Sequence, residues 1–210
     1  MDYIAHLIER YPALQVCEKS LHDAYRILEK SYESGGKLLI AGNGGSAADS
    51  DHISGELLKS FVLKRKPEKS FLDRLAEIDP ETGSYLSDKI QGSLPAIPLT
   101  THSALMTASL NDVDGNVLFA QQVMGYGKPE DVFLGISTSG NSKDVIYAMV
   151  VAKAKNLKTI ALTGRDGGKI KNLADVSIIV PQTETYKIQE LHLPVYHALC
   201  LELEAHFFSE

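Results

Sequence analysis

The sequence contains no tryptophan, few cysteines and no long run of positive charge. Its two cysteines, Cys17 and Cys200, lie far apart without the C-x-x-C spacing of redox and zinc motifs, which favours a reducing compartment and apolar packing of both thiols. The formal net charge is −6, so a nucleic-acid partner is not expected. No signal-peptide pattern opens the chain, and no apolar run reaches the ~18 residues needed for a membrane span. These absences predict a cytoplasmic protein without a nucleic-acid or membrane partner.

Short apolar runs alternate with helical segments along most of the chain. Its 210 residues, 44% of them hydrophobic, are enough for one core, and we expect a single domain over 1–210. The expected strands are 37–41, 95–99, 131–136, 158–162 and 176–180, and the expected helices are 46–64, 102–110, 117–124, 143–155, 168–174 and 184–208. This alternation predicts an α/β fold, a five-stranded parallel sheet with helices on both faces.

Two segments lie outside this alternation. Residues 1–34 read as a helical arm in which Pro12 begins a second helix, and its apolar stripe packs either on the sheet or on a second subunit. Residues 65–93 are charged and polar, with one short helix expected at 71–76. We interpret 65–93 as an insertion over or beside the site and leave open whether part of it is disordered.

A glycine-rich turn follows the first expected strand. Asn43, Gly44, Gly45 and Ser46 join this strand to a helix, where free backbone N–H groups and the helix dipole favour an anion. Farther along the same helix, His52-x-x-x-Glu56 places two side chains on one face, about 6 Å apart along the axis. This pair can share a metal or a substrate just beyond the turn.

A second polar loop follows the third expected strand. Ser137, Thr138, Ser139 and Ser142 supply four hydroxyls beside a helix N-terminus, an arrangement that suits the oxygens of a phosphate. A simple helix cap is the alternative, although one cap needs only one hydroxyl. The pattern is neither a P-loop nor a G-x-G-x-x-G fingerprint, so a sugar phosphate fits better than a nucleotide. Both loops lie at carboxyl ends of strands, where open parallel sheets bind ligands.

Taken in order, the motifs resemble the phosphoheptose isomerase (sedoheptulose 7-phosphate isomerase) family of SIS (sugar isomerase) domains. The motifs that carry the resemblance are G-N-G-G-S at 42–46, H-x-x-x-E at 52–56, Asn111-Asp112, G-I-S-T-S-G-N-S at 135–142, L-T-G-x-D-G-G at 162–168, I-Q-E-x-H at 188–192 and His197. They cover about 40–200, and the insertion at 65–93 is longer than we expect for the family.

The resemblance implies a three-layer, flavodoxin-like SIS domain and a homotetramer with active sites between subunits. By the same resemblance, phosphate would be held by Ser46, Ser137, Ser139 and Ser142, and the sugar chain would be contacted by Asn43, Asn111, Asp112, Thr138 and Gln189. Gly44 and Gly45 would also belong to the substrate-binding residues. Glu56 and His197 would be the acid/base pair. One Zn²⁺ per site would be bound by His52, Glu56, Gln189 and His197. The implied reaction converts sedoheptulose 7-phosphate to a D-glycero-heptose 7-phosphate for the heptose of lipopolysaccharide or capsule.

The chemistry of that assignment is reasonable, but its geometry raises a difficulty. A carboxylate and a histidine can move the two protons of an aldose–ketose isomerisation, and a divalent metal can polarise the carbonyl. Gln189 and His197, however, lie about 12 Å apart along a straight helix. We therefore expect either a bend at Pro194 or ligands from two subunits. His192 is expected either to be structural or to support the residues that bind the ligand, without touching it.

Two other functions compete with this assignment. The insertion raises the possibility of an isomerase for a different phosphosugar. A non-catalytic, DiaA-like SIS adaptor that binds a protein partner is the alternative from another class. The presence of Glu56 together with His52, Gln189 and His197 favours an enzyme over an adaptor.

Overall fold

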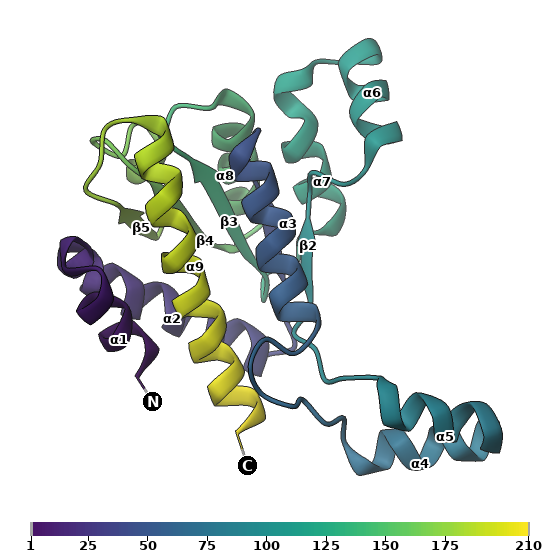
Figure 1. The fold of residues 1–210 in the computed structure, drawn as a ribbon. Helices are drawn as coiled ribbons and strands as arrows, with labels where there is room; N and C mark the ends of the chain where they lie inside the picture. Colours follow the sequence, from purple (N-terminus) through teal and green to yellow (C-terminus); the bar gives the residue numbers. More distant parts are fainter. Residues whose placement is uncertain (1, 210) are drawn as a thin grey trace.

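The computed structural model describes residues 2–209 and contains one parallel sheet (Figure 1). The strand order is β2-β1-β3-β4-β5. The strands are β1 Leu38–Ala41, β2 Ala96–Pro98, β3 Val132–Ser137, β4 Lys158–Thr163 and β5 Val176–Ile179. All five expected strands are therefore present, and β2, whose prolines suit an edge, is an edge strand.

The central strands are buried on both faces because helices cover the sheet on each side. Along β1, Leu38 and Ile40 point into one apolar cluster and Leu39 and Ala41 into the other. The first face carries α1 Tyr3–Arg10, α2 Glu18–Glu33, α3 Gly45–Leu58 and α9 Thr185–Phe208, and the second carries α7 Leu118–Tyr126 and α8 Lys143–Ala154. This arrangement confirms the three-layer α/β fold (Figure 1).

The chain changes face between β1 and β3, and this change positions the two polar loops. From β1 it continues into α3 on the first face, whereas from the neighbouring β3 it continues into α8 on the second face. The loops after these two strands therefore diverge at the carboxyl edge of the sheet. Such a switch point is where open α/β sheets bind ligands.

The N-terminal arm consists of α1, a 3₁₀ helix at Pro12–Cys17, and α2. The expected start of a new helical segment at Pro12 is confirmed. Ile4 and Leu7 on α1 and Leu21 on α2 are buried in the cluster that includes α9 and the first face of the sheet. The apolar stripe of the arm thus finds its packing surface within its own chain.

The helix expected at 46–64 is shorter in the structure, because α3 ends at Leu58. The backbone N–H groups of Phe61, Val62 and Leu63 donate to the Glu204 carboxylate of α9. Since these groups bind a side chain on another helix, they cannot continue the i→i−4 bonding of α3. A long-range contact therefore ends the helix.

Residues 65–93 contain two helices, α4 Lys69–Ile78 and α5 Pro80–Lys89, where one short helix was expected. Asp79 separates them and caps α5 by accepting from the Thr82 N–H at 2.7 Å. The two helices form an antiparallel hairpin that extends away from the sheet, at the end of α3 opposite the polar loops (Figure 1). In one chain it does not cover those loops.

The remaining elements are α6 Ser103–Asp112 and 3₁₀ helices at Gly115–Val117 and Ile170–Asn172. The last of these replaces the short helix expected at 168–174. Cys17 and Cys200 are buried free thiols, as expected, and burial raises the pKa of Cys17 to about 11. Within residues 2–209, no helix has both the length and the apolar character to cross a bilayer.

Candidate active site

The serine-rich loop begins inside the sheet. Ser137 is the last residue of β3 and is buried, and its Oγ lies 2.9 Å from the Ser142 Oγ. Ser142 occupies the N-cap position of α8, yet its side chain makes no capping hydrogen bond. The simple-cap interpretation therefore fails for this residue, and its hydroxyl is directed across the loop to Ser137.

A second glycine-rich segment, residues 164–168, packs against the backbone of the serine-rich loop. A Cβ on Gly140 would collide with the carbonyl of Gly167, and one on Gly168 would collide with the carbonyl of Ser139. The Ile170 N–H donates to the Gly140 carbonyl at 3.0 Å. This close contact needs glycine on both sides, and it fixes the path of the serine-rich loop just before α8.

The loop after β1 reaches the start of α8, directly after the serine-rich loop. Gly44 precedes α3 with φ +56°, a left-handed conformation that favours glycine, and Ser46 is buried in the first turn. The Asn43 Nδ2 donates to both carboxylate oxygens of Asp144, at 3.1 and 2.8 Å. Asp144 was not predicted as a site residue, because an acidic residue in the first turn of α8 looks like an ordinary helix-dipole partner.

Gln189 reaches this loop from α9. Its Nε2 lies 2.4 Å from the position that a Cβ on Gly45 would take, so the two residues are in close contact. Gln189 is therefore beside the glycine-rich loop, as its predicted contact with the sugar requires. The role itself stays a prediction.

Gly45→Ala is expected to displace the Gln189 amide without unfolding the protein. Gly45 has no left-handed φ, and the atom that the new methyl meets is the end of a flexible side chain. Loss of about one hydrogen bond, on the order of 1 kcal/mol, would raise KM roughly 5-fold. Steady-state kinetics measures this effect.

Gly55→Ala is the matched control, since it places the same methyl on the same helix where nothing lies within 4 Å. An unchanged KM in Gly45→Ala, or an equal rise in both variants, would remove Gln189 from the substrate site.

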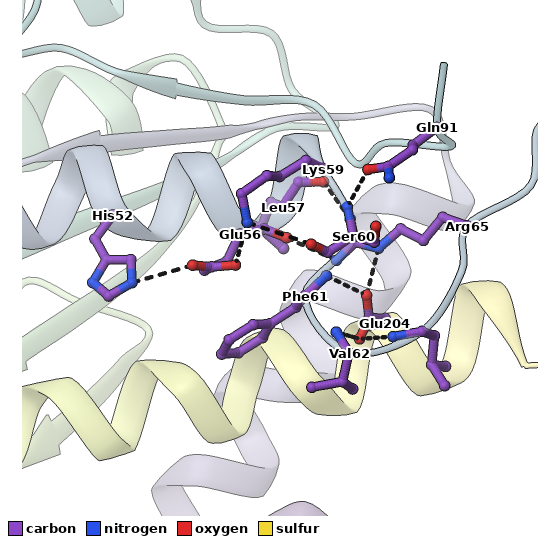
Figure 2. A network of polar contacts seen from close by, with 11 residues as sticks. His52, Glu56, Leu57, Lys59, Ser60, Phe61, Val62, Arg65, Gln91 and Glu204 are labelled. Atoms are coloured by element: carbon purple, nitrogen blue, oxygen red, sulfur yellow. Dashed lines mark hydrogen bonds and ion pairs between the residues drawn. The ribbon is translucent and has the colours of Figure 1, made fainter. Parts of the chain in front are cut away.

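His52 and Glu56 form a close pair on α3, about two turns after Gly45. The His52 Nε2 lies 3.2 Å from Glu56 Oε1, and Lys59 Nζ lies 3.1 Å from Glu56 Oε2 (Figure 2). The Glu56 side chain is only 12% exposed. The i, i+4 spacing thus produces the contact that the sequence predicts.

His197 approaches this pair from α9. Its ring centroid lies 5.0 Å from that of His52 and 5.3 Å from that of Phe61. Burial lowers the pKa of His197, His52 lowers it further, and Glu56 acts in the opposite direction. His197 Nε2 is buried without a hydrogen-bond partner among residues 2–209. A mainly neutral imidazole with a free nitrogen therefore faces the His52–Glu56 pair.

Tyr196 and Asp49 also belong to this cluster around His52, and neither was predicted from the sequence as a site residue. The Tyr196 hydroxyl lies 2.9 Å from His52 Nδ1 and 3.2 Å from Asp49 Oδ1. Burial raises the pKa of Asp49 and also that of Tyr196. Tyr196 lies in an apolar run next to His197, so its pattern resembles core packing. Asp49 could have been found from its position one turn before His52.

His192 lies on α9 between Gln189 and His197 but is part of the core. It is fully buried, and burial lowers the pKa of His192 to about 4. Its ring therefore stays neutral at physiological pH.

The predicted zinc ligands are only partly brought together. His52, Glu56 and His197 are neighbours, and nitrogen and carboxylate ligands with an orphaned buried His197 Nε2 suit zinc chemically. Helix α9 runs through Pro194 without interruption. Gln189 therefore lies about two turns before His197 on this helix and contacts Gly45 at the start of α3. In the described chain, no group of three His, Cys, Asp or Glu side chains is close enough to hold a metal. The zinc assignment stays a prediction.

Asn111 and Asp112 lie at the end of α6, exposed to solvent. The Asn111 Nδ2 donates to Asp112 Oδ1 at 2.8 Å. No described hydrogen bond joins either residue to the two polar loops of the same chain.

A buried ion pair fastens the end of α3 to α9. The Arg65 Nε donates to Glu204 Oε1 at 2.7 Å, and both side chains are 0% exposed (Figure 2). Arg65 also donates to the last carbonyls of α3, those of Glu56 and Leu57, at 2.7 Å each. Burial would raise the pKa of Glu204, but the N–H groups of Phe61 and Val62, with Arg65, lower it overall. This clamp holds Glu56 against the helix that carries His197.

Comparisons with known proteins show which family the chain resembles. Residues 99–202 match the SIS domain family. The chain is 38% identical to the phosphoheptose isomerase of Helicobacter pylori strain P12 over 206 residues, 98% of this chain and 94% of the relative. It is also 38% identical to the one from Crocosphaera subtropica over 192 residues, 91% of this chain and 85% of the relative.

Solved structures support the same grouping. The phosphoheptose isomerase of Neisseria gonorrhoeae superposes with a TM-score of 0.73 at 35% identity, covering 96% of each chain. That of Francisella tularensis has a TM-score of 0.76 at 29% identity, covering 96% of this chain and 94% of the other. With these identities over nearly the full length, the chain belongs to the phosphoheptose isomerase family of SIS-domain enzymes.

Proposed function

We propose that this protein isomerises sedoheptulose 7-phosphate to a D-glycero-heptose 7-phosphate. The observation that carries the proposal is the grouping of Glu56 and His197 around His52, on the two helices α3 and α9, of which α3 starts at the glycine-rich loop. The serine-rich loop, with its two facing hydroxyls of Ser137 and Ser142, suits the phosphate. The names of the relatives supply the substrate class.

The reaction needs one carbon-bound and one oxygen-bound proton to move. In the proposed mechanism Glu56 takes a proton from C1, which forms the C1=C2 double bond of an enediol, and later returns a proton to C2. His197 accepts the proton of the O1 hydroxyl and delivers one to O2. A histidine whose pKa lies below its ordinary value begins this cycle in the required neutral form.

His52 Nε2 and Glu56 Oε1, 3.2 Å apart, are the atoms of this chain that would hold a divalent metal. His197 is not close enough in the described chain to complete a three-residue set, so a further ligand would have to come from a movement of His197 or from another subunit. When bound, such an ion would polarise the carbonyl of the sugar.

We propose further that the working enzyme is a homotetramer with active sites at subunit interfaces. Asn111 and Asp112 are exposed and separate from the loops of their own chain, which suits residues that contact a sugar held by another subunit. Gln189, which lies apart from His197 on the uninterrupted α9, also suits a ligand set shared between subunits.

Proton NMR of the purified protein with sedoheptulose 7-phosphate, with and without zinc, tests the reaction. We expect anomeric signals of an aldoheptose 7-phosphate to appear, and faster in the presence of zinc. Turnover that is unaffected by zinc and by a chelator would exclude the metal from the proposal. No turnover, from folded protein that still binds the sugar phosphate, would reject the substrate in favour of another phosphosugar or of a non-catalytic adaptor.

A further inference from the structure

Tyr196 connects two parts of the site that come from different turns of α3. Its hydroxyl lies 2.9 Å from His52 Nδ1 and 3.2 Å from Asp49 Oδ1. Tyr196 is buried on α9, with 2% of its surface exposed. The hydroxyl therefore has two polar partners, and its direction decides the protonation of the His52 ring.

The chemistry of Asp49 and His52 decides to which of them the Tyr196 hydroxyl donates its proton. The Tyr196 hydroxyl donates to Asp49 Oδ1, because a carboxylate that is ionised at pH 8, even one whose pKa burial raises, only accepts hydrogen bonds. The Tyr196 oxygen then accepts from His52, which requires a proton on His52 Nδ1. The other ring nitrogen, Nε2, faces Glu56 Oε1 at 3.2 Å.

We propose that Asp49 and Tyr196 are positioning residues that keep a proton on Nδ1 of His52, so that His52 presents Nε2 to Glu56. A nitrogen lone pair and a carboxylate oxygen that face each other favour a cation between them, either a proton or a metal ion. Metal-ligating histidines commonly donate their second ring N–H to another group of the protein. Here the Tyr196 oxygen accepts that bond. The part of this inference that concerns metal rests on the proposed function.

Without the tyrosine hydroxyl the opposite tautomer is favoured. In Tyr196→Phe, a proton on Nδ1 has lost its acceptor, whereas a proton on Nε2 can still donate to Glu56. His52 would then present a donor, and not a lone pair, to the site.

The test is long-range ¹H–¹⁵N correlation NMR of chelator-treated, ¹⁵N-histidine-labelled protein at pH 8. His52→Gln identifies the His52 signals by their loss. We expect a protonated Nδ1 in the wild type and, in Tyr196→Phe, an unprotonated Nδ1 with a protonated Nε2. An unprotonated Nδ1 in the wild type would overturn the proposal, and so would a Tyr196→Phe spectrum with Nδ1 still protonated.

Tyr32→Phe is the matched control, because it removes another buried tyrosine hydroxyl, one that donates to the Pro95 carbonyl at 3.2 Å. Its His52 signals should equal those of the wild type. Zinc affinity, measured by competition with a chromogenic chelator, should fall about 10- to 100-fold in Tyr196→Phe alone. Equal zinc affinity in wild type and Tyr196→Phe would refute the claim that Tyr196 supports metal binding by His52. A wild type that binds no zinc would refute the zinc of the proposed function and leave the tautomer result standing.

Discussion

Glu56→Gln is expected to lower kcat by about 10²–10⁴-fold, the usual contribution of a general base. The amide keeps the size of the side chain but cannot take a proton from carbon. KM for the sugar phosphate should change little, because the proposed phosphate ligands Ser137 and Ser142 belong to the serine-rich loop and Glu56 belongs to α3. The NMR turnover assay with purified variant measures kcat.

Two controls separate this effect from a folding defect. Glu33→Gln makes the same chemical change at the exposed end of α2 and should retain full activity. Circular dichroism should show an unchanged fold for Glu56→Gln. A folded Glu56→Gln enzyme with wild-type kcat would exclude Glu56 as the base.

Arg65→Met is expected to destabilise the protein by about 3–5 kcal/mol, because it leaves a buried charge without its partner. At about 2–4 °C per kcal/mol for a chain of this size, Tm would fall by roughly 6–20 °C. The variant also removes the donors to the carbonyls of Glu56 and Leu57, so the end of α3 should loosen. Thermal unfolding followed by circular dichroism measures Tm.

Lys69→Met is the matched control, since it removes a lysine from an exposed ion pair with Asp73 on α4. Exposed pairs are screened by water, so Tm should barely change. Equal Tm shifts in Arg65→Met and Lys69→Met would mean that the buried clamp contributes no more than a surface pair.

The same clamp predicts a sensitivity to acid. The pKa of Glu204 is lowered in the folded protein, so its contribution is present above the unfolded value of about 4.3 and is lost as the pH falls through the folded value. Glu204→Gln should be less stable than the wild type at pH 7, and the difference should shrink as the pH falls from about 4.3 toward the folded value. A difference that stays constant over this range would show that Glu204 is not the titrating group.

The features that the sequence predicted are those set by local periodicity. Alternation of apolar runs and helical segments located the five strands, and the i, i+4 spacing placed His52 beside Glu56. The order of strands and helices also predicted that the loops carrying Asn43 and Ser139 lie at the same edge of the sheet. Such patterns depend on neighbours within one or two turns, which the linear sequence contains.

The features that the sequence missed depend on contacts between distant segments. Glu204 ends α3 by binding N–H groups 141 to 143 residues earlier in the chain. Tyr196 reaches His52 across 144 residues, and Asn43 meets Asp144 across 101 residues. None of these pairs leaves a periodic signal.

The sequence by itself therefore determined the sheet, its two polar loops and the His52–Glu56 pair, because hydrophobic periodicity and turn chemistry act locally. Only the tertiary structure decided where α3 ends, which ring nitrogen of His52 faces Glu56, and that Gln189 lies beside Gly45 while His197 lies beside His52. The packing of α9 against α3 settles all three features, since the geometry between two helices is set by the side chains that meet in the folded protein.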